Sequence, residues 1–183
     1  MKNSFPAKKI AVLALLTTLG LIAFLLESLL PPLFVPGAKP GLSNLFSLLA
    51  LVLFSPWEAF AVLLARTLLA ALFGGNVSAL LYSLSAGAVS MALSSVLWYY
   101  GKNSFSLPAV SVCSAVLHNM VQLIVYCLTT GSVTLIGYAP VLALCGVLSG
   151  AIVGGLAAGI LRAIPGELLQ KISEETLTKY NKK

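Results

Sequence analysis

The feature that most constrains the fold is a series of about six long apolar stretches, separated by short segments rich in glycine, proline and polar residues. A helix needs roughly 20 apolar residues to cross the hydrocarbon core of a bilayer. Hydrophobic residues make up 59% of the 183 residues, which leaves little chain for a water-soluble domain. The runs are continuous and show no alternation of period two, which favours helices over a barrel. The sequence therefore predicts an all-α, polytopic membrane protein.

The breaks between the runs define the expected helices. The run 10–30 ends at two prolines, which disfavour further helix. The segment 31–44 holds four prolines and two glycines, typical of a structured loop that dips into a bundle. The run 42–54 is short for a full crossing, which fits such a loop. The other expected helices are 57–73, 77–100, 108–128 and 136–164, so that a six-helix membrane domain, 10–164, lies between a cytoplasmic N-terminus, 1–9, and a cytoplasmic tail, 165–183.

The basic residues predict the orientation of these helices. Six crossings place both termini on one side of the membrane, and most Lys and Arg residues then lie on that side. Lys39 is the one basic residue expected in an outer loop. Basic residues concentrate on the cytoplasmic side, so both termini are expected to be cytoplasmic. The net charge of +6 is thus explained by topology, and we expect no nucleic-acid partner.

The chain lacks the residues that nucleotide hydrolysis and metal binding need. The chain has no Asp, no Walker A motif and no His/Cys set with metal-ligand spacing. Cys113, Cys127 and Cys145 all lie in apolar runs, where free cysteines usually serve as small packing residues. We therefore expect no catalytic residue, no metal and no cofactor in this chain.

Arg66 is the strongest functional signal, because it lies within the apolar run 57–73. An arginine at the centre of a membrane helix costs at least ~2.5 kcal/mol and is expected to face a partner or a wet cavity. Two interpretations are open: a structural pair with Glu27, or contact with an anionic or carbonyl-bearing ligand. His118 is equally open, since a neutral imidazole can be structural or ligand-binding.

The polar residues of the membrane domain gather in its outer half. His118 and Gln122 are four residues apart and share one helix face. Asn76 also has a simpler interpretation as a turn residue. Lys39 and Arg66 are suited to negative charge. The candidate substrate-binding residues are Lys39, Asn44, Arg66, Asn76, His118, Asn119 and Gln122.

Small residues recur at helical spacing in the first and last runs. Such spacing lets two helix backbones approach closely, either inside the bundle or against another membrane protein. For the last run we expect internal packing of its small residues, Gly146, Gly150, Gly154, Gly155, Ala158 and Gly159. Both alternatives are open for Ala7, Ala11 and Ala14.

Three segments resemble a known family: PGAKPGLSN at 36–44, GNVSALLYSLSAGAVS at 75–90 and AVLHNMVQL at 115–123. They look like the Gx transporter family, also labelled heptaprenyl diphosphate synthase component I, over about residues 8–165. That family is similar to the substrate-binding S components of energy-coupling factor (ECF) transporters.

The resemblance to S components implies a six-helix bundle in the bacterial plasma membrane that captures a small vitamin-like or cofactor-precursor molecule from outside. It implies as partners a transmembrane coupling subunit and two cytoplasmic ATPase subunits, and a docking role for Ala7, Ala11 and Ala14.

The synthase label implies a different activity. A polyprenyl diphosphate synthase binds its diphosphate through Mg²⁺ held by aspartate-rich motifs, whereas this chain has no Asp. We therefore expect no synthase activity from this chain. The alternative function is a membrane accessory subunit in heptaprenyl diphosphate or quinone metabolism. A purely structural membrane subunit would leave an unpaired Arg66 unexplained.

Overall fold

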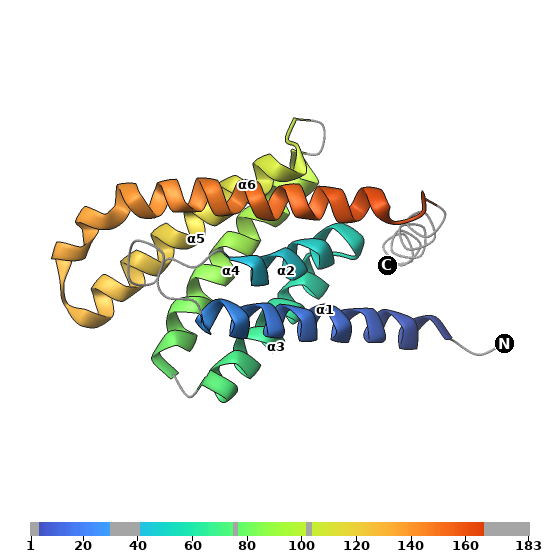
Figure 1. Ribbon diagram of the computed structural model, residues 1–183, viewed down its shortest axis with the longest axis horizontal. Coiled ribbons are helices and arrows are strands. Elements are labelled where there is room, and N and C mark those ends of the chain that lie inside the picture. The colour runs from blue at the N-terminus through green and yellow to red at the C-terminus, as the bar shows by residue number, and fades with distance from the viewer. Residues whose placement is uncertain (1–3, 30–40, 75–76, 102–103, 167–183) are drawn as a thin grey trace.

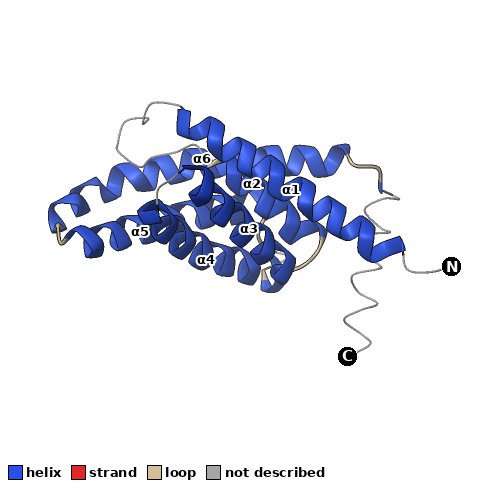
Figure 2. Ribbon diagram, turned by 90° about the horizontal axis from the view of Figure 1, so that it is seen from below, coloured by secondary structure: helices blue, strands red, loops and turns tan. Residues whose placement is uncertain are grey.

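The computed structural model describes residues 4–29, 41–74, 77–101 and 104–166. Within these ranges the chain is helical and has no strand, and short connections join the helices (Figures 1 and 2). The elements in chain order are α1 (Ser4–Leu29), α2 (Leu42–Leu53), α3 (Pro56–Gly74), α4 (Val77–Tyr100), α5 (Leu107–Thr130), the 3-10 helix η1 (Val133–Tyr138) and α6 (Ala139–Ala163).

Five of these helices are long and apolar enough to cross a membrane, and α2 is a shorter apolar helix. The predicted all-α membrane fold is confirmed, as is the shortness of the second helix. With 12 residues, α2 is about 18 Å long, against a hydrocarbon core of about 30 Å. It therefore spans part of the depth that its neighbours cross.

Two helix boundaries differ from those that the sequence predicts. α1 begins at Ser4 and not at residue 10, because Pro6 falls in the first turn, where a missing N–H is tolerated. Ala7 therefore lies inside the helix. Residues 133–138 form η1 before α6 starts, whereas the sequence predicts an α-helix from 136. Pro140 stands in the first turn of α6, which is where proline favours the start of a helix.

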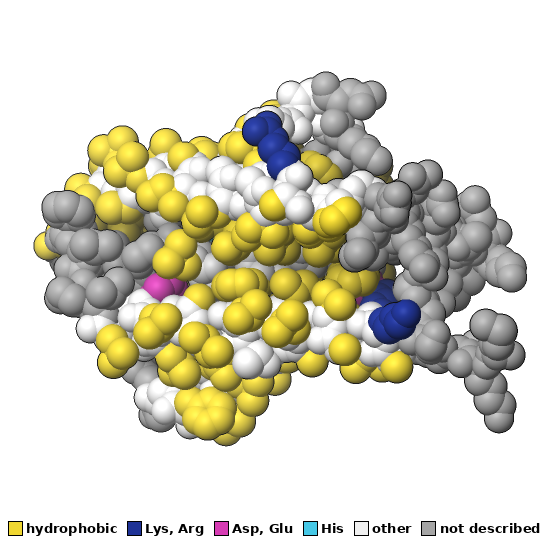
Figure 3. Space-filling view, turned by 45° about the vertical axis from the view of Figure 1, so that its right-hand side comes forward, with side chains coloured by type: hydrophobic (Ala, Val, Ile, Leu, Met, Phe, Trp, Pro, Cys, Tyr) yellow, Lys and Arg dark blue, Asp and Glu magenta, His cyan; other side chains and the backbone are white. Residues whose placement is uncertain are grey.

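The core of the bundle is built around α2. This helix packs against α1, α3, α6 and α4, and Figure 1 shows it between α1 and α6. Ala50 and Leu51 are fully buried, and they belong to one apolar cluster with Val62 and Leu63 of α3. In contrast, large apolar side chains such as Leu72 lie exposed on the outside of the bundle. Hydrophobic side chains cover most of the described surface in Figure 3, as expected for a surface that faces lipid.

Glycines set the most extensive helix contact, between α5 and α6. A Cβ atom on Gly150 would lie 2.6 Å from Cα of Val112, and one on Gly154 would lie 2.5 Å from Cα of Pro108. Gly146 lies against the backbone of α5 in the same way. The prediction of internal packing is thus confirmed for Gly146, Gly150 and Gly154. It is wrong for Gly155 and Gly159, which lie on an exposed face of α6, where a Cβ atom would meet nothing within 4 Å.

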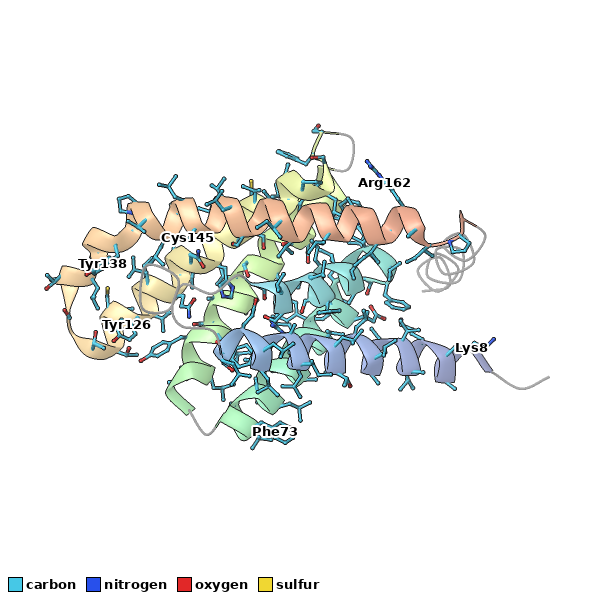
Figure 4. All side chains as sticks on the ribbon, in the orientation of Figure 1. Lys8, Phe73, Tyr126, Tyr138, Cys145 and Arg162 are labelled. Atoms are coloured by element: carbon cyan, nitrogen blue, oxygen red, sulfur yellow. The ribbon has the colours of Figure 1, made fainter. Side chains whose placement is uncertain are left out.

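The first turn of α1 and the last turn of α6 lie at the same end of the bundle (Figure 1). Lys8 and Arg162 project outward near that end (Figure 4). Lys9 forms a salt bridge with Glu58, and Ser55 donates a hydrogen bond to the same carboxylate. These contacts tie the start of α1 to the turn between α2 and α3.

We expect Gly150→Ala to destabilise the protein, because the new methyl group would meet backbone atoms of α5 that cannot rotate away. Overpacking of this kind costs about 1–3 kcal/mol. Thermal unfolding in detergent measures the effect. Gly155→Ala is the matched control, since its Cβ meets no atom within 4 Å. Equal melting temperatures for the two variants would contradict the assigned packing.

Candidate binding pocket

A cavity of about 420 Å³ opens among the helices, in the half of the bundle away from the first turn of α1. All six α-helices contribute to its lining. Its volume falls within the range of small-molecule pockets, about 300–1,000 Å³. Apolar atoms make up most of the lining, and a few polar side chains converge on it.

Five of the seven predicted site residues line this one cavity. Helices α2, α3 and α5 bring them together, although the first and the last of them are 78 residues apart in the sequence. The other two, Lys39 and Asn76, lie outside the described residues. The five lining residues are Asn44, Arg66, His118, Asn119 and Gln122.

Arg66 is the central polar group of the pocket. It lies on α3 with an exposed fraction of 5%, and its Nη2 donates a hydrogen bond to Oδ1 of Asn44 over 3.1 Å. Its Nε atom is buried and has no hydrogen-bond partner among the residues that the structure describes. A buried donor without a partner is unfavourable by about 1–3 kcal/mol, and more for a charged group. The guanidinium is therefore able to bind a further acceptor.

Glu27 contributes a negative charge to the pocket that Arg66 lines. Its carboxylate accepts a hydrogen bond from the backbone N–H of Leu42 at the start of α2, where a negative charge is favourable. Glu27 and Arg66 line the same cavity, and opposite charges attract. Both partners of the structural pair that the sequence left open thus line one cavity, while Nε of Arg66 is available to bind a further acceptor.

The path of the Arg66 side chain depends on Gly20, which sequence reasoning missed. A Cβ atom on Gly20 would lie 2.8 Å from Cδ of Arg66 and 3.5 Å from Cβ of Phe46. The side chain of Arg66 therefore passes over the bare backbone of α1 on its way into the pocket. Nothing in the sequence marks this contact, because 46 residues separate the two positions.

The start of α2 also depends on a glycine. Gly41 has φ of +74°, in the left-handed region that favours glycine, and its carbonyl accepts a hydrogen bond from the N–H of Asn44. This turn places Asn44 in the first turn of α2, where its side chain accepts the hydrogen bond from Arg66.

Two of the pocket residues on α5, His118 and Asn119, also contact neighbouring helices. Nδ1 of His118 lies 3.3 Å from Oγ of Ser90 on α4, and Nδ2 of Asn119 donates to the carbonyl of Leu142 on α6 over 2.9 Å. These contacts hold α5 to both neighbouring helices while the two side chains line the pocket. Sequence reasoning also missed other lining residues, because aromatic and hydroxyl side chains are common in membrane helices: Phe24, Tyr82, Ser83 and Thr67.

The fold and the pocket define a class: a helical, multi-pass membrane protein with a polar cavity inside the bundle. The chain belongs to the heptaprenyl diphosphate synthase component I family, whose model matches residues 16–160. This confirms the family resemblance that the sequence motifs carry. A search of curated proteins and a search of solved structures each found no match.

We expect Gly20→Ala to displace Arg66 and to destabilise the protein by about 1–3 kcal/mol. A double-mutant cycle with Arg66→Ala measures whether the two positions interact, since contacting residues show coupling energies of about 0.5–3 kcal/mol. The cost of Gly20→Ala should fall in the Arg66→Ala background, where Cδ is gone. An unchanged cost would show that the methyl group disturbs something other than Arg66.

Proposed function

We propose that this chain is the substrate-binding component of an ECF-type importer. It captures a small vitamin-like or cofactor-precursor molecule from outside, and partner subunits supply the energy for uptake. The observation that carries the proposal is the buried Arg66 guanidinium, which lines a cavity of about 420 Å³ with an unpartnered Nε. A charge in a membrane bundle is expected to serve a ligand, an ion path or a structural pair.

The polarity of the pocket supports binding of an acceptor group. Nε of Arg66 is a donor, and the start of α2 adds the positive end of a helix dipole. Glu27 lines the same cavity, and its negative charge disfavours a multiply charged anion. A carboxylate or a carbonyl on a mostly uncharged molecule fits this balance, and the size of the pocket fits a small molecule.

The same proposal assigns the chain a non-enzymatic role in the cell membrane, with a coupling subunit and two ATPases as partners. The surface of α1 supports a docking role for this helix. Ala7, Ala11 and Ala14 are all exposed, so they do not pack inside the bundle. Small residues on an outer face allow close approach of a second membrane helix.

The family description favours a second candidate function, that of an accessory subunit in heptaprenyl diphosphate metabolism. In that case the pocket would hold a prenyl diphosphate or a quinone precursor, with Arg66 facing its polar end. Native mass spectrometry separates the two functions, because it identifies the bound molecule by its mass.

We expect native mass spectrometry of the purified protein to detect a bound small molecule that Arg66→Ala loses. Arg66→Lys should retain it weakly, since an ammonium keeps the charge but not the planar donor fork. Arg162→Ala is the control, because Arg162 lies at the end of α6 outside the pocket. A vitamin-like compound supports the importer and a prenyl diphosphate supports the second candidate, whereas equal occupancy in Arg66→Ala contradicts the assigned site.

We expect Ala11→Leu to abolish copurification with an ATPase module while the protein keeps its bound small molecule. The added side chain would hold a docking helix away from α1. Ala61→Leu on α3 is the matched control, since Ala61 is also an exposed alanine of a membrane helix. Copurification that survives Ala11→Leu would place the docking surface elsewhere.

A further inference from the structure

A second, smaller cavity of about 40 Å³ adjoins the binding pocket. The two cavities share Gly41, Asn44, Ala115 and Ser149 in their linings. Serines from four helices converge on the smaller cavity, and no charged side chain is among the described residues that line it. We call it the serine cavity; its serines are Ser47 of α2, Ser90 and Ser94 of α4, Ser111 and Ser114 of α5, and Ser149 of α6.

Most of these hydroxyls have already donated their protons to helix carbonyls. A serine hydroxyl carries one proton and two lone pairs, so each of them keeps acceptor capacity after this donation. The hydroxyls that have donated therefore offer acceptors to the cavity. The four bonds are Ser90 to Gly87 at 3.1 Å, Ser94 to Ser90 at 3.0 Å, Ser114 to Ser90 at 3.1 Å and Ser149 to Gly146 at 3.3 Å.

Ser47 differs from the other serines of this cavity. Its exposed fraction is 1%, and its Oγ is buried without a hydrogen-bond partner in the described part of the chain. Ser47 lies on α2, within one turn of Asn44, which belongs to both cavities. A buried hydroxyl without a partner is unfavourable by about 1–3 kcal/mol, so a polar group that enters the cavity would gain this bond.

We propose that the serine cavity is the inner subsite of the binding pocket and that it takes an uncharged hydrogen-bond donor of the captured molecule, such as a hydroxyl or an amide. This inference rests on the proposed capture function. The acceptor-rich lining disfavours an anion there, and the nearby Arg66 guanidinium and the start of α2 disfavour a cation. The captured molecule thus presents an acceptor to Arg66 and a neutral donor to the serines.

The test is the rate at which methyl methanethiosulfonate, a small neutral thiol reagent, modifies Ser47→Cys. The three natural cysteines are first replaced by alanine. Ala50→Cys is the control, since Ala50 lies on the same helix but is fully buried in the apolar cluster. Thiols buried among apolar groups react slowly, so we expect Ser47→Cys to react roughly tenfold faster or more. Equal rates would overturn the proposal.

Two further measurements test the route and the chemistry. Ala115→Leu fills the junction between the cavities and should slow the modification of Ser47→Cys. Acetamide should protect this thiol better than acetone, which has nearly the same shape but no N–H donor, by up to about tenfold if one hydrogen bond decides. Equal protection, or no effect of Ala115→Leu, would overturn the proposal. If Ser47→Cys does not fold, Ser94→Cys reports on the same cavity.

These rates do not depend on which molecule the protein captures. A wild-type protein that carries no small molecule would count against the proposed capture function, while the labelling would still test the polar subsite. Conversely, unreactive Ser47→Cys in a protein that binds a small molecule through Arg66 would overturn the subsite alone.

Discussion

The burial of a short helix is the constraint on which the rest of this structure depends. α2 packs against four other helices, yet its 12 residues span only part of the membrane depth. Where it is present, leucines and alanine fill the centre of the bundle at high density. Ser43 and Asn44, in the first turn of α2, line the pocket. Helix α2 therefore both stabilises the fold and forms part of the cavity wall.

Charged and polar side chains at the start of α2 make this part of the cavity polar. Glu27 from α1, Asn44 from α2 and Arg66 from α3 meet where the helix dipole is positive. Arg66 reaches this point because Gly20 leaves room for its side chain. The cavity thus holds charges of both signs, while one guanidinium donor has no hydrogen-bond partner among the described residues.

Much of this organisation is predictable from local sequence patterns. The helices follow from the apolar runs and their proline and glycine breaks, and the shortness of α2 follows from its run. Gly146, Gly150 and Gly154 of α6 pack as their spacing indicates, whereas Gly155 and Gly159 do not. Residues such as Arg66 and His118 stand out because polar groups in membrane helices are costly. In contrast, Gly20 and Ser47 carry no local signal, since their roles depend on residues from other helices.

The sequence by itself determined the class of fold, the family and the set of polar residues available for a site, because hydrophobicity and spacing act along the chain. The tertiary structure decided which of those residues meet. Only packing places Asn44 beside Arg66, lets α1 make room for the guanidinium, and gathers serines from four helices around one small cavity. These contacts join segments far apart in sequence, and their geometry follows from how the helices cross and not from any local preference.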